Sequence, residues 1–123
     1  MLETNDMSSK NAYEDIECFK MVYKKSDETC VSYVMGYEYT IGEENIPIKV
    51  ETDNTLYKDV DGEKFLVVRE GYHSYARKED IQPCNNTVIV RCIIPAGSQY
   101  FVDTYKKHYV SSNIIIKEYI KKD

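Results

Sequence analysis

The sequence predicts a mainly β (α+β) protein, in which a twisted antiparallel sheet or a partly open small barrel carries one or two short helices. The strongest run, 87–94, is rich in β-branched residues and apolar on both faces, which is typical of a central strand. Shorter alternating or apolar runs recur between glycine- and proline-containing turns. No stretch shows the 3.6-residue periodicity of a long amphipathic helix.

The length of 123 residues fits one compact domain. Residues 1–14 are polar and lack periodicity, so we expect a flexible N-terminal arm followed by a single β-rich domain over 15–123. No apolar run approaches the roughly 18 residues of a membrane span, and the acidic start differs from a secretory signal. These features predict a cytoplasmic protein without membrane contact.

The first elements form a predicted hairpin. Residues 16–23 alternate, with Phe19 on one side and Lys20 on the other. After a polar turn, 30–35 is a second β-type run. Residues 37–42 then form a short edge strand that ends at a glycine.

The second half begins with an irregular stretch, 43–63, whose Asp61-Gly62 dipeptide predicts a turn into the next strand. Residues 77–82 offer a short helical turn that Pro83 ends. The remaining predicted strands are 65–69, 87–94, 99–102 and 113–120.

The four cysteines show no C-x-x-C spacing, which disfavours a zinc site, and no other cofactor is predicted. Cys18, Cys30 and Cys92 fall within apolar strand patterns, where a reduced thiol packs as a small core residue. Two disulfides remain the alternative. The net charge of −5 argues against general nucleic-acid binding but leaves room for a local basic pocket.

The segment 69–78 concentrates arginine, lysine, histidine and tyrosine directly after an apolar strand. Arginine suits phosphate or carboxylate, tyrosine can stack on a base, and histidine can add a hydrogen-bond donor. Such groups suit a small anionic ligand that carries a ring. The candidate ligand-binding residues are Arg69, Tyr72, His73, Tyr75, Arg77 and, from the strand 87–94, Arg91.

A structural interpretation of the same residues stands beside the functional one. Tyr72 and His73 would pack under a loop, while Arg69 and Arg77 would pair with nearby acids. Arg91 would point to solvent from a sheet face that is partly wet. Gly71 would either let the backbone approach a ligand or supply a positive φ at a turn.

Catalytic patterns are weak in this sequence. It contains no G-x-S-x-G, no glycine-rich phosphate loop and no H-E-x-x-H, and its only histidines are His73 and His108. An enzyme is therefore not predicted. A minimal ADP-ribosyl-transfer-like activity that uses Tyr72 and His73 is the remaining catalytic alternative.

Three short motifs carry a resemblance. They are 36–42 (GYEYTIG), 71–73 (GYH) and 94–98 (IPAGS) with Tyr100. Together they resemble small uncharacterised domains of bacteriophages and gut-type bacteria, over about residues 17–120. The resemblance implies a phage or mobile-element setting inside a bacterial host cell.

The leading hypothesis is a non-enzymatic protein that binds a small anionic, nucleotide-derived ligand, as a phage counter-defence sponge would. The alternative is an interaction module that inhibits or adapts a host or virion protein through a strand edge or a tyrosine-rich face. The chain has 12 tyrosines and no tryptophan, which fits either hypothesis. The sequence leaves self-association open.

Overall fold

The structure is a computed structural model that describes residues 2–5, 8–33, 36–50, 52–68 and 70–120. Within these residues the chain forms antiparallel sheets of nine and three strands and one short 3-10 helix, η1 (Lys78–Asp80). The strands are β1 (Leu2–Thr4), β2 (Lys10–Asn11), β3 (Ile16–Lys24), β4 (Thr29–Ser32), β5 (Glu38–Thr40), β6 (Thr52–Val60), β7 (Glu63–Val68), β8 (Tyr72–Tyr75), β9 (Val88–Ile94), β10 (Gln99–Val102), β11 (His108–Ser111) and β12 (Ile115–Tyr119).

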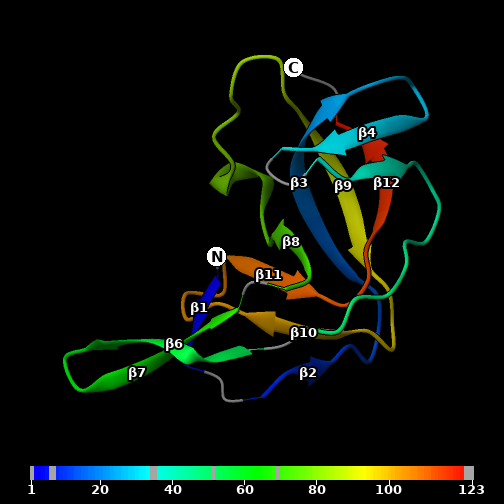
Figure 1. The fold of residues 1–123 in the computed structure, drawn as a ribbon. Helices are drawn as coiled ribbons and strands as arrows, with labels where there is room; N and C mark the ends of the chain where they lie inside the picture. Colours follow the sequence, from blue (N-terminus) through cyan, green and yellow to red (C-terminus); the bar gives the residue numbers. More distant parts are fainter. Residues whose placement is uncertain (1, 6–7, 34–35, 51, 69, 121–123) are drawn as a thin grey trace.

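The larger sheet runs in the order β12-β9-β3-β8-β11-β10-β2, and β4 pairs with both β3 and β5. The smaller sheet runs β1-β7-β6. In Figure 1, β3, β9 and β12 run lengthwise through the upper part of the molecule, whereas β11 and β10 lie across its lower part and β8 lies between the two groups. The β6–β7 hairpin projects from the lower part (Figure 1). The large sheet therefore changes direction between its two halves.

Strand β3 is where the two halves meet. One edge of β3 pairs with β9 over all of residues 16–22. Its other edge is divided, because β4 pairs with residues 22–24 and β8 meets β3 at the single register pair Phe19 and Tyr75. Beyond β4 and β8 the sheet continues in two separate directions, towards β5 and towards β11.

Two hydrophobic clusters fill the interior. The first lies on the inner face of β3 and β9, where Cys18, Val22, Val90, Cys92 and Ile94 are all fully buried. The second lies where the small sheet packs against β10 and β11, and it consists of Leu2, Val50, Val68, Phe101 and Val110. Both faces of β11 are covered, since Val110 and its neighbour Ser111 are each 0% exposed.

The mainly β, antiparallel fold predicted from the sequence is confirmed. The one or two short helices are not: among the described residues, the only helical element is the 3-10 turn η1. The three residues of η1 are too few for the hydrogen-bonded turns of an α-helix, and Pro83, which cannot continue a helix, follows soon after. The larger sheet stays open from β12 to β2 rather than closing into a barrel. No helix within the described part of the chain is long and apolar enough to span a bilayer.

Several predicted elements lie where the sequence places them. Strand β9 is an interior strand between β12 and β3, and β3 and β4 form the predicted hairpin. The β6–β7 turn uses Asp61 and Gly62, with φ of 53° and 83°. The three cysteines assigned to the core are buried free thiols, while Cys84 is exposed and also free.

The N-terminal segment and the segment after residue 70 differ from expectation. Residues 2–4 and 10–11, expected to lie in an arm, form β1 and β2, and Leu2 and Ala12 are 3% and 5% exposed. Strands β1 and β2 are too short to show a periodic pattern of apolar residues in the sequence. They form because they pair with β7 and β10, which are distant in the chain. Residues 72–75, which lie outside the strands predicted from the sequence, form β8 for the same reason.

Gly71 precedes β8 and has a φ of +133°, which side chains rarely adopt. A Cβ atom at this position would lie 2.5 Å from Cγ1 of Val110 and 3.1 Å from the carbonyl oxygen of Ser111. The glycine therefore permits close packing of the chain against β11. Of the two roles considered from the sequence for Gly71, the structure shows the positive φ.

Replacing Gly71 by alanine should destabilise the protein by roughly 2–4 kcal/mol, because backbone strain and a steric overlap with Val110 add together. Gly42 is the matched control, since it also has a positive φ of +84° but nothing lies within 4 Å of its added Cβ. Gly42→Ala should cost only about 1–2 kcal/mol. Urea unfolding of both variants measures the difference. An equal loss of unfolding free energy in the two variants would show that the overlap with Val110 does not add to the destabilisation.

Candidate functional site

Strand β8 carries four of the residues in the candidate segment and divides them between two faces. Its side chains alternate between buried and accessible along the strand. Tyr72 and Ser74 point to the first core, opposite Ser111 and Tyr109 of β11. His73 and Tyr75 lie on the other face.

Tyr72 is part of the core, with 7% of its surface exposed. Its hydroxyl donates a hydrogen bond to the carbonyl oxygen of Ile46 at 2.6 Å, and its ring centre lies 6.2 Å from that of Tyr39. Burial raises the pKa of the Tyr72 phenol. These contacts hold the segment before Val50 against β8, so the ring face of Tyr72 is occupied by protein.

Tyr75 pairs across the strands with His108, the first residue of β11. Their ring centres are 4.6 Å apart, and the rings are inclined at 60°. Nδ1 of His108 lies 3.1 Å from Oδ2 of Asp103, which fixes the orientation of the imidazole. With Nδ1 protonated towards the carboxylate, Nε2 is an acceptor in the neutral ring and a donor in the charged one.

Asp103 also shapes the turn before β11. Its Oδ1 accepts hydrogen bonds from the backbone N–H groups of Lys107 at 2.6 Å and His108 at 3.1 Å. The carboxylate itself is only 12% exposed, whereas the His108 side chain is 45% exposed. A single acid therefore positions both the lysine backbone and the histidine ring, without presenting its own charge fully to solvent.

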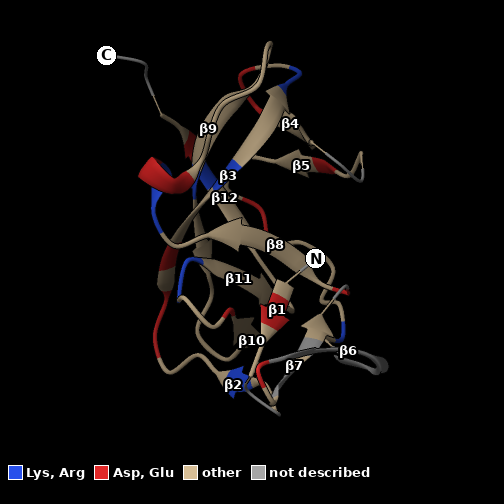
Figure 2. Ribbon diagram, turned by 90° about the vertical axis from the view of Figure 1, so that its left-hand side faces the viewer, with Lys and Arg blue, Asp and Glu red and all other residues tan. Residues whose placement is uncertain are grey.

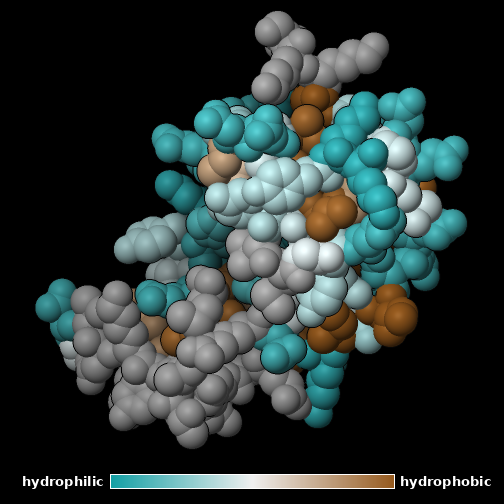
Figure 3. Space-filling view, turned by 45° about the horizontal axis from the view of Figure 1, so that its top comes forward, coloured by the Kyte–Doolittle hydropathy of each residue, from teal (hydrophilic) through white to brown (hydrophobic). Residues whose placement is uncertain are grey.

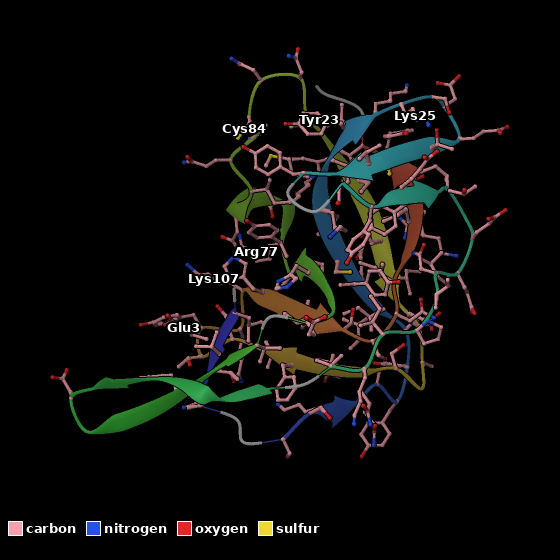
Figure 4. All side chains as sticks on the ribbon, viewed as in Figure 1. Glu3, Tyr23, Lys25, Arg77, Cys84 and Lys107 are labelled. Carbon is pink, nitrogen blue, oxygen red and sulfur yellow. The ribbon has the colours of Figure 1, made fainter. Side chains whose placement is uncertain are left out.

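Arg77 and Lys107 add positive charge beside the ring pair. The backbone N–H of Ala76 donates to the carbonyl oxygen of Lys107 at 2.8 Å, which brings the two chain segments together. Figure 4 shows Arg77 and Lys107 near each other, and Figure 2 shows the basic segments before η1 and before β11 at the same edge of the molecule. We call Tyr75, Arg77, Lys107 and His108 the basic patch.

The patch is not free of acidic groups. Nε of Arg77 lies 3.7 Å from a carboxylate oxygen of Glu79, and the two side chains are 69% and 57% exposed. Because a pair this open to solvent contributes little, Arg77 can turn towards another anion at small cost.

Arg91 lies on the outer face of the large sheet, two strands away from Tyr75. The register places Tyr75 opposite Phe19, and Phe19 opposite Arg91. Nε of Arg91 lies 2.9 Å from Oε1 of Glu118, its neighbour on β12, and a third of the arginine side chain is exposed. The sequence alternative that Arg91 faces outward from the sheet matches this position, and β3 separates it from the basic patch.

The structure thus brings Tyr75 and Arg77 together, with the exposed His73 on the same face of β8. It places Tyr72 in the core and Arg91 at a distance, and Arg69 lies outside the described residues. Sequence reasoning did not assign Lys107 and His108 to the site. The tripeptide Lys106-Lys107-His108 was a visible signal, but the pairing of β8 with β11 was not.

Lys20 is the most unusual ionisable group outside the patch. It lies on the inner face of β3 between Cys18 and Val22 and is only 9% exposed. Its Nζ donates to the carbonyl oxygen of His73 and lies 5.7 Å from the centre of the Tyr39 ring. No ion pair with a carboxylate is found for it in the described part of the chain. Burial lowers the pKa of the Lys20 amine, although the nearby cysteines oppose this effect.

Comparison with known proteins gives no relative. No protein-family model matches the chain, and neither a curated protein nor a solved structure is significantly similar to it. The site must therefore be interpreted from its own geometry.

Lys20→Met keeps an unbranched side chain that is one heavy atom shorter and removes the amine. We expect the variant to be more stable than the wild type at pH 7, because burial of the amine costs more than its contact with His73 returns. The unfolded chain holds the lysine proton up to its ordinary pKa of 10.5, but the folded protein releases it at lower pH. Wild-type stability should consequently rise with pH through this window, by at most about 1.4 kcal/mol per pH unit.

Urea unfolding of both proteins from pH 6 to pH 10 tests this prediction. Two of the three buried thiols act in the opposite direction at the alkaline end, since burial raises the pKa of Cys30 to about 11 and that of Cys92 well above its ordinary value. Both proteins contain these thiols, so the difference between the two stability curves isolates Lys20. A difference that is constant over the whole range would contradict the expected titration.

Proposed function

We propose that this protein is a non-enzymatic binding protein that captures a small anionic ligand carrying a ring, of the nucleotide class, at the basic patch. The observation that supports this most is the Tyr75–His108 ring pair, 4.6 Å between centres, set beside Arg77 and Lys107. One end of the patch is suited to a ring and the other to phosphate.

The four side chains of the basic patch suit different parts of such a ligand. Arg77 offers a planar fork that binds two phosphate oxygens at once, and Lys107 adds a second positive charge. Tyr75 and His108 offer ring surfaces and polar tips for a base or sugar. The protein is acidic as a whole, so these cations create a local attraction for an anion rather than a general affinity for nucleic acid.

Preorganisation supports binding at this place. Tyr75 belongs to a strand, and Asp103 holds the turn that presents Lys107 and His108. A ligand that meets side chains already oriented pays less conformational entropy on binding. The Asp103–His108 pair also resembles the orienting half of a catalytic triad, but the hydrogen bonds of His108 within the described part of the chain involve no serine or cysteine nucleophile. Binding without turnover is therefore the function that we propose.

The biological setting that we propose is a phage counter-defence sponge, which removes a nucleotide signal from a bacterial host cell. This part of the proposal depends on the resemblance of the short motifs 36–42, 71–73 and 94–98 alone. A sponge binds its nucleotide without converting it, so this setting requires that the protein releases the ligand chemically unchanged.

Thermal shift and titration calorimetry with cyclic nucleotides, ADP-ribose and inorganic phosphate test the binding proposal. A cognate nucleotide at about 100 times its Kd should stabilise the native state by about 2.7 kcal/mol, and phosphate alone should bind more weakly. Arg77→Glu should weaken nucleotide binding at least about tenfold, because it removes a charge-assisted contact and adds repulsion.

Lys25→Glu is the matched control, because it makes the same change of charge away from the patch. Lys25 is 59% exposed and pairs with Glu38 of β5 at 3.1 Å, and Figure 4 shows it well away from Arg77. This variant should bind like the wild type. The proposal fails if no nucleotide shifts the midpoint, or if both charge reversals weaken binding equally.

A second candidate is an interaction module that contacts a host or virion protein, and a pair of exposed tyrosines favours it. The rings of Tyr23 and Tyr33 lie 5.7 Å apart, and the residues are 37% and 42% exposed. A hydrogen bond with the exposed Cys84 raises the pKa of Tyr33, and Figure 4 shows Tyr23 and Cys84 in the same region. On the face drawn in Figure 3, however, the exposed hydrophobic side chains form separate small areas among hydrophilic ones.

Affinity capture from a bacterial lysate distinguishes the two candidates. A stoichiometric protein partner that is lost with Tyr23→Ala and Tyr33→Ala, but retained with Arg77→Glu, would favour the interaction module. Retention of a small molecule by the wild type, together with its loss in Arg77→Glu, would favour the ligand-binding proposal.

A further inference from the structure

Cys18 and Cys92 lie directly opposite each other in the centre of the large sheet. Cys18 belongs to β3 and Cys92 to β9, and the register pairs them across the two strands. Both are free thiols, and both are 0% exposed. Their side chains share the buried inner face of the sheet, where the Cys92 thiol donates a weak hydrogen bond to the carbonyl oxygen of Val90 at 3.8 Å.

This register meets the Cα-separation requirement of a disulfide. Directly opposite residues of antiparallel strands have Cα atoms about 4.5–5.5 Å apart, and a disulfide accepts Cα separations of about 4.4–6.8 Å. The other buried thiol has no such partner. Cys30 of β4 lies opposite Lys24 on one side and Tyr39 on the other.

The surroundings of the pair make the two sulfur atoms unequal. Hydrogen bonding with Cys92 lowers the pKa of the Cys18 thiol, and Ser74 and the Lys20 amine act in the same direction, although burial raises it. Burial raises the pKa of the Cys92 thiol. The Ser74 hydroxyl is 3% exposed and forms no hydrogen bond with the residues that the structure describes. It is thus available to donate to an anion on Cys18.

We propose that Cys18 and Cys92 form a redox-active dithiol that a small hydroperoxide oxidises to a disulfide between β3 and β9. Cys18 thiolate attacks one peroxide oxygen, the O–O bond breaks, and the leaving oxygen takes up a proton to become the alcohol or water. Cys92 sulfur then attacks the sulfenic acid on Cys18, and the departing hydroxide leaves with the Cys92 proton as water. Two thiols lose two electrons and two protons, and one peroxide accepts them.

Both thiols are enclosed by the core, so an oxidant must be small and uncharged to reach them. A hydroperoxide meets both conditions. The amine of Lys20 favours the thiolate that begins the reaction, and Ser74 can hydrogen-bond the oxygen that Cys18 acquires. This dithiol lies on the face of β3 that points away from Tyr75. It is therefore independent of the proposed ligand-binding function.

The full chain with Cys84→Ser, which lacks the exposed thiol, is treated with hydrogen peroxide, alkylated after denaturation and analysed by mass spectrometry. The folded protein should lose two hydrogen atoms and retain one alkylatable thiol. Trypsin digestion should join the peptides 11–20 and 92–106, which contain Cys18 and Cys92. The oxidised protein should melt roughly 10 °C higher than the reduced one, and dithiothreitol should reverse the change.

Cys30→Ala in the same background is the matched control, since Cys30 is also a fully buried thiol of the first core. It should oxidise as the parent does, whereas Cys18→Ala should not lose two hydrogen atoms. If Cys18→Ala does not fold, the peptide map of the Cys84→Ser protein decides alone. A folded protein that stays fully reduced, that only gains oxygen atoms, or that joins any other pair of cysteines would overturn the proposal.

Discussion

The division of one edge of β3 between two partners is the constraint on which the rest of the fold depends. Along its other edge, β3 is paired with β9 through residues 16–22. On the divided edge β4 occupies the end of the strand, so β8 can meet β3 only at Phe19. The sheet must therefore separate into two halves beyond β3. The ladder of β8 is incomplete on the side that faces this division.

Lys20 completes that ladder. The N–H of Ala76 donates to the carbonyl oxygen of Lys107, just before β11, so alternation along β8 turns the carbonyl oxygen of His73 towards β3, which the register pairs with β8 only at Phe19 and Tyr75. The amine of Lys20 supplies the hydrogen bond instead. A buried carbonyl without a donor costs about as much as a lost hydrogen bond. Lys20 therefore satisfies a carbonyl oxygen that an apolar residue could not, although burial of its amine costs more than this hydrogen bond returns.

The extent to which the sequence predicts this structure follows from where the defining interactions lie. The β-branched pattern of 87–94 and the Asp61-Gly62 turn are local signals, and both elements formed where expected. The inner side of β3 could not be assigned, because Lys20 makes the core face appear polar. His108 was recognised only as a histidine, since its position beside Tyr75 depends on the pairing of β8 with β11, which no local pattern encodes.

The thiol pair includes a residue of β3, and the basic patch adjoins β3 through the pairing of Tyr75 with Phe19, which raises the question of whether oxidation would disturb the patch. Cys18 precedes Phe19, and Phe19 is the register partner of Tyr75. A disulfide brings the two Cβ atoms to about 3.5–4.5 Å, compared with about 4.5–5.5 Å for an ordinary cross-strand pair, so β3 and β9 need approach by only about 1 Å. Asp103 holds His108 and Lys107 from the far side of β8, through contacts that do not involve β3. The oxidised protein should therefore keep the geometry of the patch and gain rigidity mainly between β3 and β9.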